Sequence, residues 1–167
     1  MTKGAAGESA RVENTVSCGS CAVVTVSWTT ADDPQLTVFS TLADSAAAPF
    51  IMASSAIYDR IDGSEQAMFS PVVVSDLLRG QLVFDGVVIS DDLAEARAVT
   101  DVEVGERAVR FLAAGGTLVL TVDPATLPRM MEAVLARDAA DPAFASLVDD
   151  AVRTALLAKA RAGLLPG

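Results

Sequence analysis

Three short apolar runs, separated by stretches with helical spacing, constrain the fold of this chain more than any other feature. The runs are PFIMASS (49–55), FDGVVIS (84–90) and TLVLTV (117–122). Runs of this length, bounded by turn signals, are typical of buried strands. Strands that alternate with single helices form right-handed βαβ units, so the sequence predicts an α/β fold with a parallel sheet. A doubly wound sheet and a piece of a barrel both fit this rhythm.

Start and stop signals place the helices between these runs. Four pairs that combine a capping residue with a proline mark helix starts. They are Asp33-Pro34, Ser70-Pro71, Asp123-Pro124 and Asp141-Pro142. Glycines at Gly80 and Gly115 mark helix ends, and a further helix is predicted over 102–114. The stretch through Tyr58 and Asp62 predicts a polar loop after the first strand.

The N-terminal part is less regular. Residues 1–20 are rich in Gly, Ala and Ser and predict a loop, whereas Cys21–Trp28 has the β-branched residues of a strand. Cys18 and Cys21 form a Cys-x-x-Cys pair, which is either a redox dithiol or two small residues in a turn. Zinc would need two more soft ligands, and the chain has no third cysteine and no histidine.

Composition and charge exclude several functions. The absence of histidine excludes Ser-His-Asp hydrolysis, Cys-His hydrolysis and any His-ligated metal site in this chain. A formal net charge of -10 would repel a phosphate backbone, so no nucleic-acid partner is expected. No apolar run is long enough for a membrane span, and residues 1–9 lack the apolar core of a secretory signal, so a cytoplasmic location is the default expectation.

The hydrophobic content is high for a chain of this size. Hydrophobic residues make up 51% of the 167 residues, although a domain this small needs a largely polar surface. We therefore expect an apolar surface that is covered by a partner or by further chain.

Two adjacent carboxylates, Asp91 and Asp92, follow the second predicted strand directly. Ligands bind and catalytic residues collect at the carboxyl ends of parallel strands in α/β folds. Packing alone explains an acidic pair at this place poorly, because a buried carboxylate needs a partner. The alternative is that one of the two caps the following helix and the other is solvated. The pattern alone leaves both interpretations open.

Four strings in continuous order resemble one family of enzymes. FDGVVISDDL (84–93) is similar to the nucleophile segment of glycoside hydrolase family 3, and LLRGQLVFDG (77–86) resembles its lead-in, with Val83 where glycine is usual. PFIMASSAIYDRID (49–62) resembles the preceding strand and loop, and RAVRFLAAGGTLVLTVDP (107–124) resembles the last helix and strand of the family's barrel. Within the family, the resemblance points to the β-N-acetylhexosaminidase branch.

The resemblance implies a fold, a substrate and a reaction. The fold would be a partial (β/α)8 TIM barrel with about the last three to four βα units, its strands parallel and its helices outside. The chain would be one domain, 1–167, with a divergent segment at 1–48 and family-like βα units at 49–167. The substrate would be an N-acetylglucosaminide-like carbohydrate, whose O-glycosyl bond is hydrolysed with retention of configuration.

The resemblance also assigns roles to residues. Asp91 would be the nucleophile that forms a covalent glycosyl-enzyme intermediate. Substrate contacts would come from Lys3, Ser54, Ser55 and Asp92, of which Asp92 also supports its own loop. No metal and no organic cofactor is implied, because carboxylates carry this chemistry.

Parts of the family pattern are missing from this chain. The family carries a Lys-His-Phe-Pro-Gly-His-Gly motif upstream, of which Lys3 and Gly7 fit the register, while both histidines are absent. Glu8 or Glu13 would be the remaining choices for a proton donor. The four earlier strands of the barrel are also absent. We therefore expect a truncated chain of low activity. The alternative is a non-catalytic pseudoenzyme or a half-barrel that forms a homo-oligomer through an exposed sheet edge.

Overall fold

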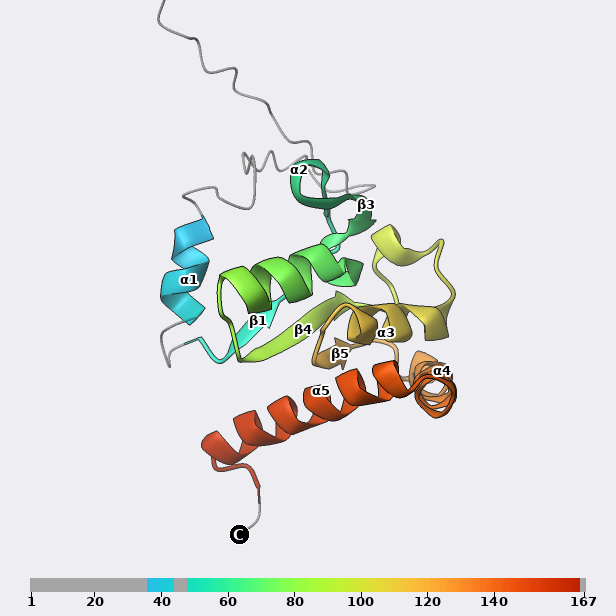
Figure 1. The fold of residues 1–167 in the computed structure, drawn as a ribbon. Coiled ribbons are helices and arrows are strands. Elements are labelled where there is room, and N and C mark those ends of the chain that lie inside the picture. The colour runs from blue at the N-terminus through green and yellow to red at the C-terminus, as the bar shows by residue number, and fades with distance from the viewer. Residues whose placement is uncertain (1–35, 44–47, 166–167) are drawn as a thin grey trace, which may run out of the picture.

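The computed structural model describes residues 36–43 and 48–165, and its centre is a parallel sheet of three strands. The strands are β1 (Phe50–Met52), β4 (Val87–Asp92) and β5 (Leu118–Leu120). β4 lies in the middle, with β1 and β5 parallel to it on either side (Figure 1). All three predicted strands are thus present. The strand predicted at Cys21–Trp28, Lys3 and the Cys18–Cys21 pair lie outside the described residues.

Three of the four capping pairs lie at helix starts, and the fourth, Asp33-Pro34, lies outside the described residues. The chain contains α1 (Thr37–Ala43), the π-helix η3 (Val72–Gln81), α3 (Val104–Ala113), α4 (Leu127–Ala140) and α5 (Pro142–Arg161). The hydroxyl of Ser70 accepts from the amide of Val73 at 3.2 Å at the start of η3. The carboxylate of Asp141 caps α5 by accepting from the amides of Ala143 and Phe144. Asp123 caps a short 3-10 turn, η5 (Pro124–Thr126), from which α4 continues.

A compact hairpin replaces the polar loop that the sequence predicts after β1. β2 (Ile57–Tyr58) pairs antiparallel with β3 (Gly63–Gln66), and the helical turn α2 (Asp59–Asp62) joins them. The turn is stabilised by Asp62, whose carboxylate accepts from the backbone and hydroxyl of Ser64 and from the hydroxyl of Ser70. These three hydrogen bonds hold the pKa of Asp62 below its ordinary value.

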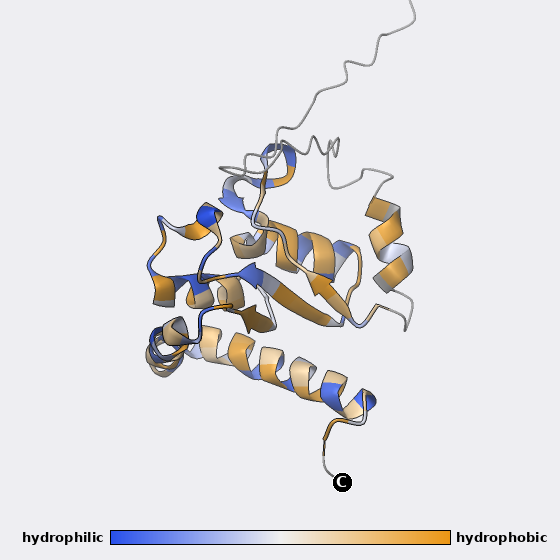
Figure 2. Ribbon diagram, turned by 180° about the vertical axis from the view of Figure 1, so that it is seen from behind, coloured by the Kyte–Doolittle hydropathy of each residue, from blue (hydrophilic) through white to orange (hydrophobic). Residues whose placement is uncertain are grey.

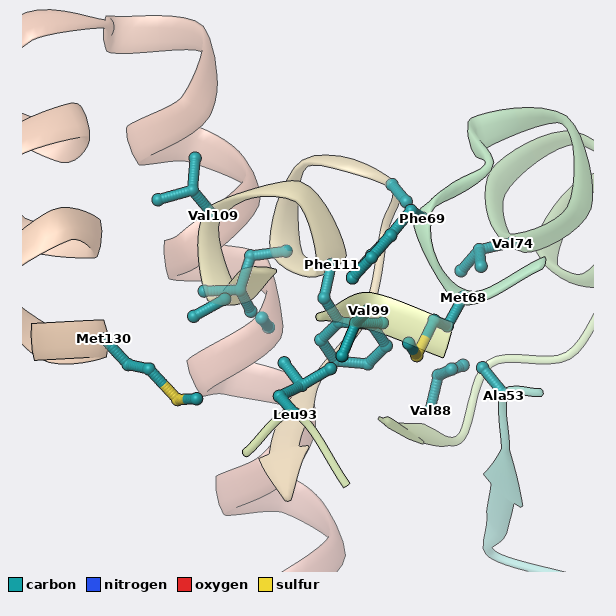
Figure 3. Packing of buried hydrophobic residues seen from close by; sticks show 14 of the residues in the cluster. Ala53, Met68, Phe69, Val74, Val88, Leu93, Val99, Val109, Phe111 and Met130 are labelled. Carbon is teal, nitrogen blue, oxygen red and sulfur yellow. The ribbon is translucent and has the colours of Figure 1, made fainter. Parts of the chain in front are cut away.

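The hydrophobic core lies between the sheet and the helices. Each strand contributes one side chain on this face: Val88 of β4 lies in the core, and Ile51 of β1 and Val119 of β5 pack against it. Figure 3 shows the fully buried ring of Phe111 from α3 close to Val99, among side chains from the sheet and its loops. α4 packs against α3, and α5 packs against both, so these helices form a further layer.

The opposite face of the sheet is partly open. Phe50 and Met52 on β1 are 51% and 60% exposed, and Val122, just after β5, is 64% exposed. The view from behind (Figure 2) shows hydrophobic residues along the strands of the sheet. Among the described residues, β1 and β5 each pair only with β4, so both edges of the sheet are free there.

Arg79 fixes the amino ends of the strands. Its guanidinium donates to the carbonyls of Gly115 and Gly86, at 3.0 and 3.2 Å, and to the hydroxyl of Thr117 at 2.9 Å. Burial lowers the pKa of Arg79, while the nearby charge of Asp85 raises it. The arginine of the LLR string therefore joins the end of η3 to the starts of β4 and β5.

Val83 is the one non-glycine residue with a positive φ in the described chain. Its φ is 55°, a left-handed conformation in which the Cβ of a branched residue is crowded. This is the position where the family string carries glycine. The side chain is 70% exposed, so it gains little from packing in return.

We expect Val83→Gly to raise the free energy of unfolding by about 1 kcal/mol, because the strain of a left-handed residue exceeds the entropic cost of glycine. Urea denaturation measures the change. Val72→Gly is the matched control, since Val72 is 42% exposed and starts η3 with no such strain. It should lower stability by about 0.5–1 kcal/mol. Equal losses in the two variants would contradict the assignment of strain to Val83.

Candidate active site

The candidate site lies at the carboxyl end of β4, where Asp91 is the second-last residue of the central strand. Its half-buried carboxylate accepts one hydrogen bond on each oxygen. The hydroxyl of Ser55 donates to Oδ2 at 2.7 Å, and the amide of Asp92 donates to Oδ1 at 2.8 Å. A negatively charged oxygen pair, held at the end of a parallel strand, is suited to attack on an electrophilic carbon.

A β-bulge next to Asp91 sets the direction of this strand end. Ile89 pairs with Leu118 and Asp92 pairs with Leu120, so β4 has one more residue than β5 between the two pairs. The fully buried Ser90 fills the gap, because its hydroxyl accepts from the amide of Leu120 at 2.8 Å. Bulges are common beside active sites, where the extra residue turns a side chain toward a new direction.

The structure separates the two serines that the sequence analysis assigns to substrate contact. Ser55 reaches Asp91, whereas the hydroxyl of Ser54 accepts from the amide of Ala56 at 3.1 Å in its own turn. Both serines are half-buried. Of the predicted site residues, the structure thus brings Ser55, Asp91 and Asp92 together, and Lys3 lies outside the described residues.

Asp92 binds the backbone of two loops at once. Its Oδ1 accepts from the amides of Ala94 and Val122 at 3.1 and 2.9 Å, and its Oδ2 accepts from the amide of Glu95 at 2.8 Å. Burial, the largest single influence, raises the pKa of Asp92. The three amides and the charge of Arg107 outweigh it and hold this pKa below its ordinary value. Asp92 therefore stays ionised and joins the loop after β4 to the end of β5.

The ionised form of Asp92 should make stability depend on pH. Since its folded-state pKa lies below the unfolded value of about 3.9, its contribution is complete above about pH 4 and is lost as pH falls through the folded-state pKa. We expect Asp92→Asn to lower the free energy of unfolding by about 2 kcal/mol at pH 6. The difference in the free energy of unfolding between Asp92→Asn and the wild type should shrink as the pH falls. Urea denaturation across this range measures it.

Asp149→Asn on α5 is the matched control, because Asp149 is exposed and no contact of its carboxylate is found in the described structure. It should leave stability within about 0.5 kcal/mol of the wild type at every pH. A loss for Asp92→Asn that stays constant down to strong acid would show that the charge of Asp92 does not stabilise the loops.

Arg107 on α3 holds the same loop from the other side. The side chain is buried, with 5% exposure, and its guanidinium donates to the carbonyls of Leu93, Ala94 and Val102 at 2.7, 2.9 and 2.8 Å. The sequence analysis gave Arg107 no role. The available signal was a cation four residues before Phe111, on the face of the predicted helix that should be apolar.

Two cavities lie away from Asp91. One, of about 900 Å³, lies between the amino ends of β1 and β4 and the last turns of α5, with Phe50, Val87 and Leu157 in its lining. The other, of about 190 Å³, is an apolar space between α1, β1 and η3, with Phe39, Ile51 and Leu77 in its lining. Neither lining includes Asp91 or Ser55, whose half-buried side chains lie at the carboxyl ends of β4 and β1.

Neither a metal-binding cluster nor a membrane span is found in residues 36–43 and 48–165. These residues contain no group of three or more Cys, Asp or Glu side chains that could hold a metal ion. No helix in the same ranges is long and apolar enough to cross a membrane.

Comparison with known proteins identifies the family. The profile of the glycosyl hydrolase family 3 N terminal domain matches residues 16–154. The chain belongs to glycosyl hydrolase family 3. The family resemblance of the four sequence strings is thereby confirmed.

Individual relatives within family 3 are named as hexosaminidases or glucosaminidases. The beta-hexosaminidase of Chromobacterium violaceum is 37% identical over 111 residues, which are 66% of this chain and 30% of the relative. The crystal structure of the β-N-acetylhexosaminidase of Beutenbergia cavernae superimposes with a TM-score of 0.77 at 43% identity, over 89% of this chain and 43% of that one. The β-N-acetylglucosaminidase of Thermotoga maritima gives a TM-score of 0.59 at 30% identity, over 66% of this chain and 25% of that one.

The chain spans less than half the length of these family 3 relatives. The superpositions confirm the predicted partial α/β barrel, with parallel strands and helices packed on them. The division of the chain at residue 48 and the roles of Asp91, Asp92, Ser54, Ser55 and Lys3 remain predictions.

Proposed function

We propose that this chain carries the nucleophile of a retaining β-N-acetylhexosaminidase site, and that Asp91 is that nucleophile. The observation that carries the proposal is the position of its carboxylate. It lies half-buried at the carboxyl end of the central parallel strand, with one hydrogen-bond donor on each oxygen. In barrels of this class, catalytic residues come from the carboxyl ends of the strands. The names of the relatives support the reaction class.

The reaction proceeds in two steps. In the first, an oxygen of Asp91 forms a bond to the anomeric carbon while the bond from that carbon to the leaving group breaks, and a glycosyl ester results. In the second, water attacks the same carbon, the ester bond breaks, its electron pair returns to Asp91, and one proton of the attacking water is released to solvent. Two inversions give net retention.

Proton transfer limits which substrates react. A sugar hydroxyl needs a proton to leave, and both histidines of the family's upstream motif are absent from this chain, which has no histidine at all. Donors whose leaving group departs as a stable anion, such as fluoride or a nitrophenolate, do not need that proton. We expect the chain to react with such activated donors much faster than with ordinary glycosides. The proposed sugar is N-acetylglucosamine-like, as the names of the relatives suggest.

Intact mass spectrometry tests the proposal. The folded chain is incubated with a 2-deoxy-2-fluoro glycosyl fluoride or an activated N-acetylglucosaminide, then digested to localise any added mass. A glycosyl adduct on Asp91 supports the proposed role. The absence of an adduct on a chain shown to be folded by circular dichroism would refute it.

A second candidate function is self-association without catalysis. It is favoured by the exposed side chains of Phe50, Met52 and Val122 and by the free edges of β1 and β5 among the described residues. Such an edge offers unpaired backbone groups to another strand. The proposed partner is a second copy of the chain, which would form a homo-oligomer. Sedimentation velocity decides, because a monodisperse monomer at high concentration would count against this candidate.

A further inference from the structure

We propose that Ser55 is a positioning residue for Asp91, whose hydroxyl fixes the plane of the nucleophilic carboxylate. The proposal rests on the proposed function of Asp91 and adds a residue that acts through it. It differs from the role expected from the sequence, in which Ser55 contacts the sugar. The observation behind it is the 2.7 Å hydrogen bond from Ser55 Oγ to Asp91 Oδ2.

An aspartate at a strand end needs such a partner. The last torsion of an aspartate side chain is broad, so its own preference does not fix the plane of the two oxygens. Attack on an anomeric carbon requires that plane to be aligned with the breaking bond. Here Asp92 N–H holds Oδ1 and Ser55 holds Oδ2, and two donors on different oxygens fix the plane. Removing either one leaves the carboxylate held at a single oxygen, which fixes its plane less firmly.

The backbone on both sides of Ser55 is fixed in place. The carbonyl of Ser54 accepts from the amide of Met68 at 3.0 Å, and the carbonyl of Ala56 accepts from the amide of Ala67 at 2.8 Å. Both donors belong to the buried turn η2 (Ala67–Phe69). Upstream, the amide of Ala53 donates to the carbonyl of Ile89 in β4 at 2.8 Å. Ser55 is therefore held at a set distance from β4 and Asp91.

A neutral donor suits both steps of the reaction. A serine hydroxyl orients the carboxylate without a formal charge of its own, so Asp91 keeps its negative charge for attack. When the ester bond to the sugar breaks in the second step, its electron pair returns to Asp91, and the hydroxyl stabilises the carboxylate that forms again. The proton of Ser55 stays on Ser55 throughout.

The first readout is the rate of adduct formation at Asp91 with a 2-deoxy-2-fluoro glycosyl fluoride, followed by intact mass. We expect Ser55→Ala to slow it about tenfold, the size of one lost charge-assisted hydrogen bond. Ser55→Thr keeps the hydroxyl and should stay within about threefold of the wild type. Ser146→Ala is the matched control, because Ser146 lies exposed on α5 and should not change the rate.

The second readout does not depend on reactivity. In protein labelled with ¹³C at the aspartate carboxyl carbons, the Asp91 resonance is assigned from its absence in Asp91→Asn. Ser55→Ala should shift this resonance, and Ser146→Ala should not. Circular dichroism confirms that each variant is folded.

The outcomes separate the two proposals. A wild-type chain that forms no adduct refutes the role of Asp91 as nucleophile, whatever Ser55 does. A wild type that reacts, together with a Ser55→Ala variant that reacts equally fast, overturns the positioning role alone, even if the carboxyl resonance moves. A slower Ser55→Ala, rescue by threonine and a shifted resonance together establish it.

Discussion

Replacing Asp91 with asparagine should reduce the rate of adduct formation with an activated fluoro sugar by about 10⁴-fold or more. The amide oxygen of asparagine has almost the same shape and position as the carboxylate but is a far weaker nucleophile. Losses of this size follow when a covalent nucleophile is removed from an enzyme. Intact mass spectrometry of the variant, at equal protein and donor concentrations, gives the rate directly.

The control for this prediction is Asp85→Asn. Asp85 precedes the same strand but lies at its amino end, beside Arg79. It should react like the wild type, because nothing at that end of the sheet contacts Asp91. If Asp91→Asn kept the wild-type rate, another side chain would be the nucleophile, and digestion of the adduct would identify it.

The second large effect is expected at Arg107. Substitution by methionine keeps roughly the length of the side chain but removes every donor, so the buried carbonyl of Leu93 and the part-buried carbonyls of Ala94 and Val102 lose their partner. Unsatisfied buried groups are costly, and we expect the free energy of unfolding to fall by about 3 kcal/mol. Asp92 would also lose the nearby positive charge that lowers its pKa. Urea denaturation measures the loss.

Two variants make the Arg107 result specific. Arg107→Lys keeps the charge but lacks the planar fork that reaches three carbonyls, so it should recover only part of the stability. Arg137→Met removes an arginine that is exposed on α4, and should change stability by less than about 0.5 kcal/mol. Equal stability of the Arg107→Met and Arg137→Met variants would contradict the structural role of Arg107.

The sequence predicts the strands and most helix starts because both depend on local signals. Short apolar runs give β1, β4 and β5, and the pairs of capping residue and proline give the starts of η3, η5 and α5. The location of Asp91 at a strand end follows from the same runs. That Ser55 lies near Asp91 follows as well, because adjacent parallel strands place their carboxyl ends together.

The finer geometry of the site depends on contacts between distant residues and was not predictable in this way. The bulge at Ser90 requires the register of β4 against β5. Two of the three carbonyls that the buried guanidinium of Arg107 contacts lie in a loop 13 and 14 residues earlier in the chain. The β2–β3 hairpin is set by Asp62 and its partners Ser64 and Ser70, the second of which lies eight positions further along the chain. In each case, a side chain satisfies backbone or polar groups that only the folded chain brings near.

The order of the strands has a consequence for how the chain is made. β1, β4 and β5 lie in the sheet in the order in which they occur in the sequence. Each later strand joins the free side of the strand before it, so no paired strands have to separate to admit another. The sheet can therefore be assembled in chain order, and the strand that bears Asp91 follows its first neighbour, β1, in the sequence.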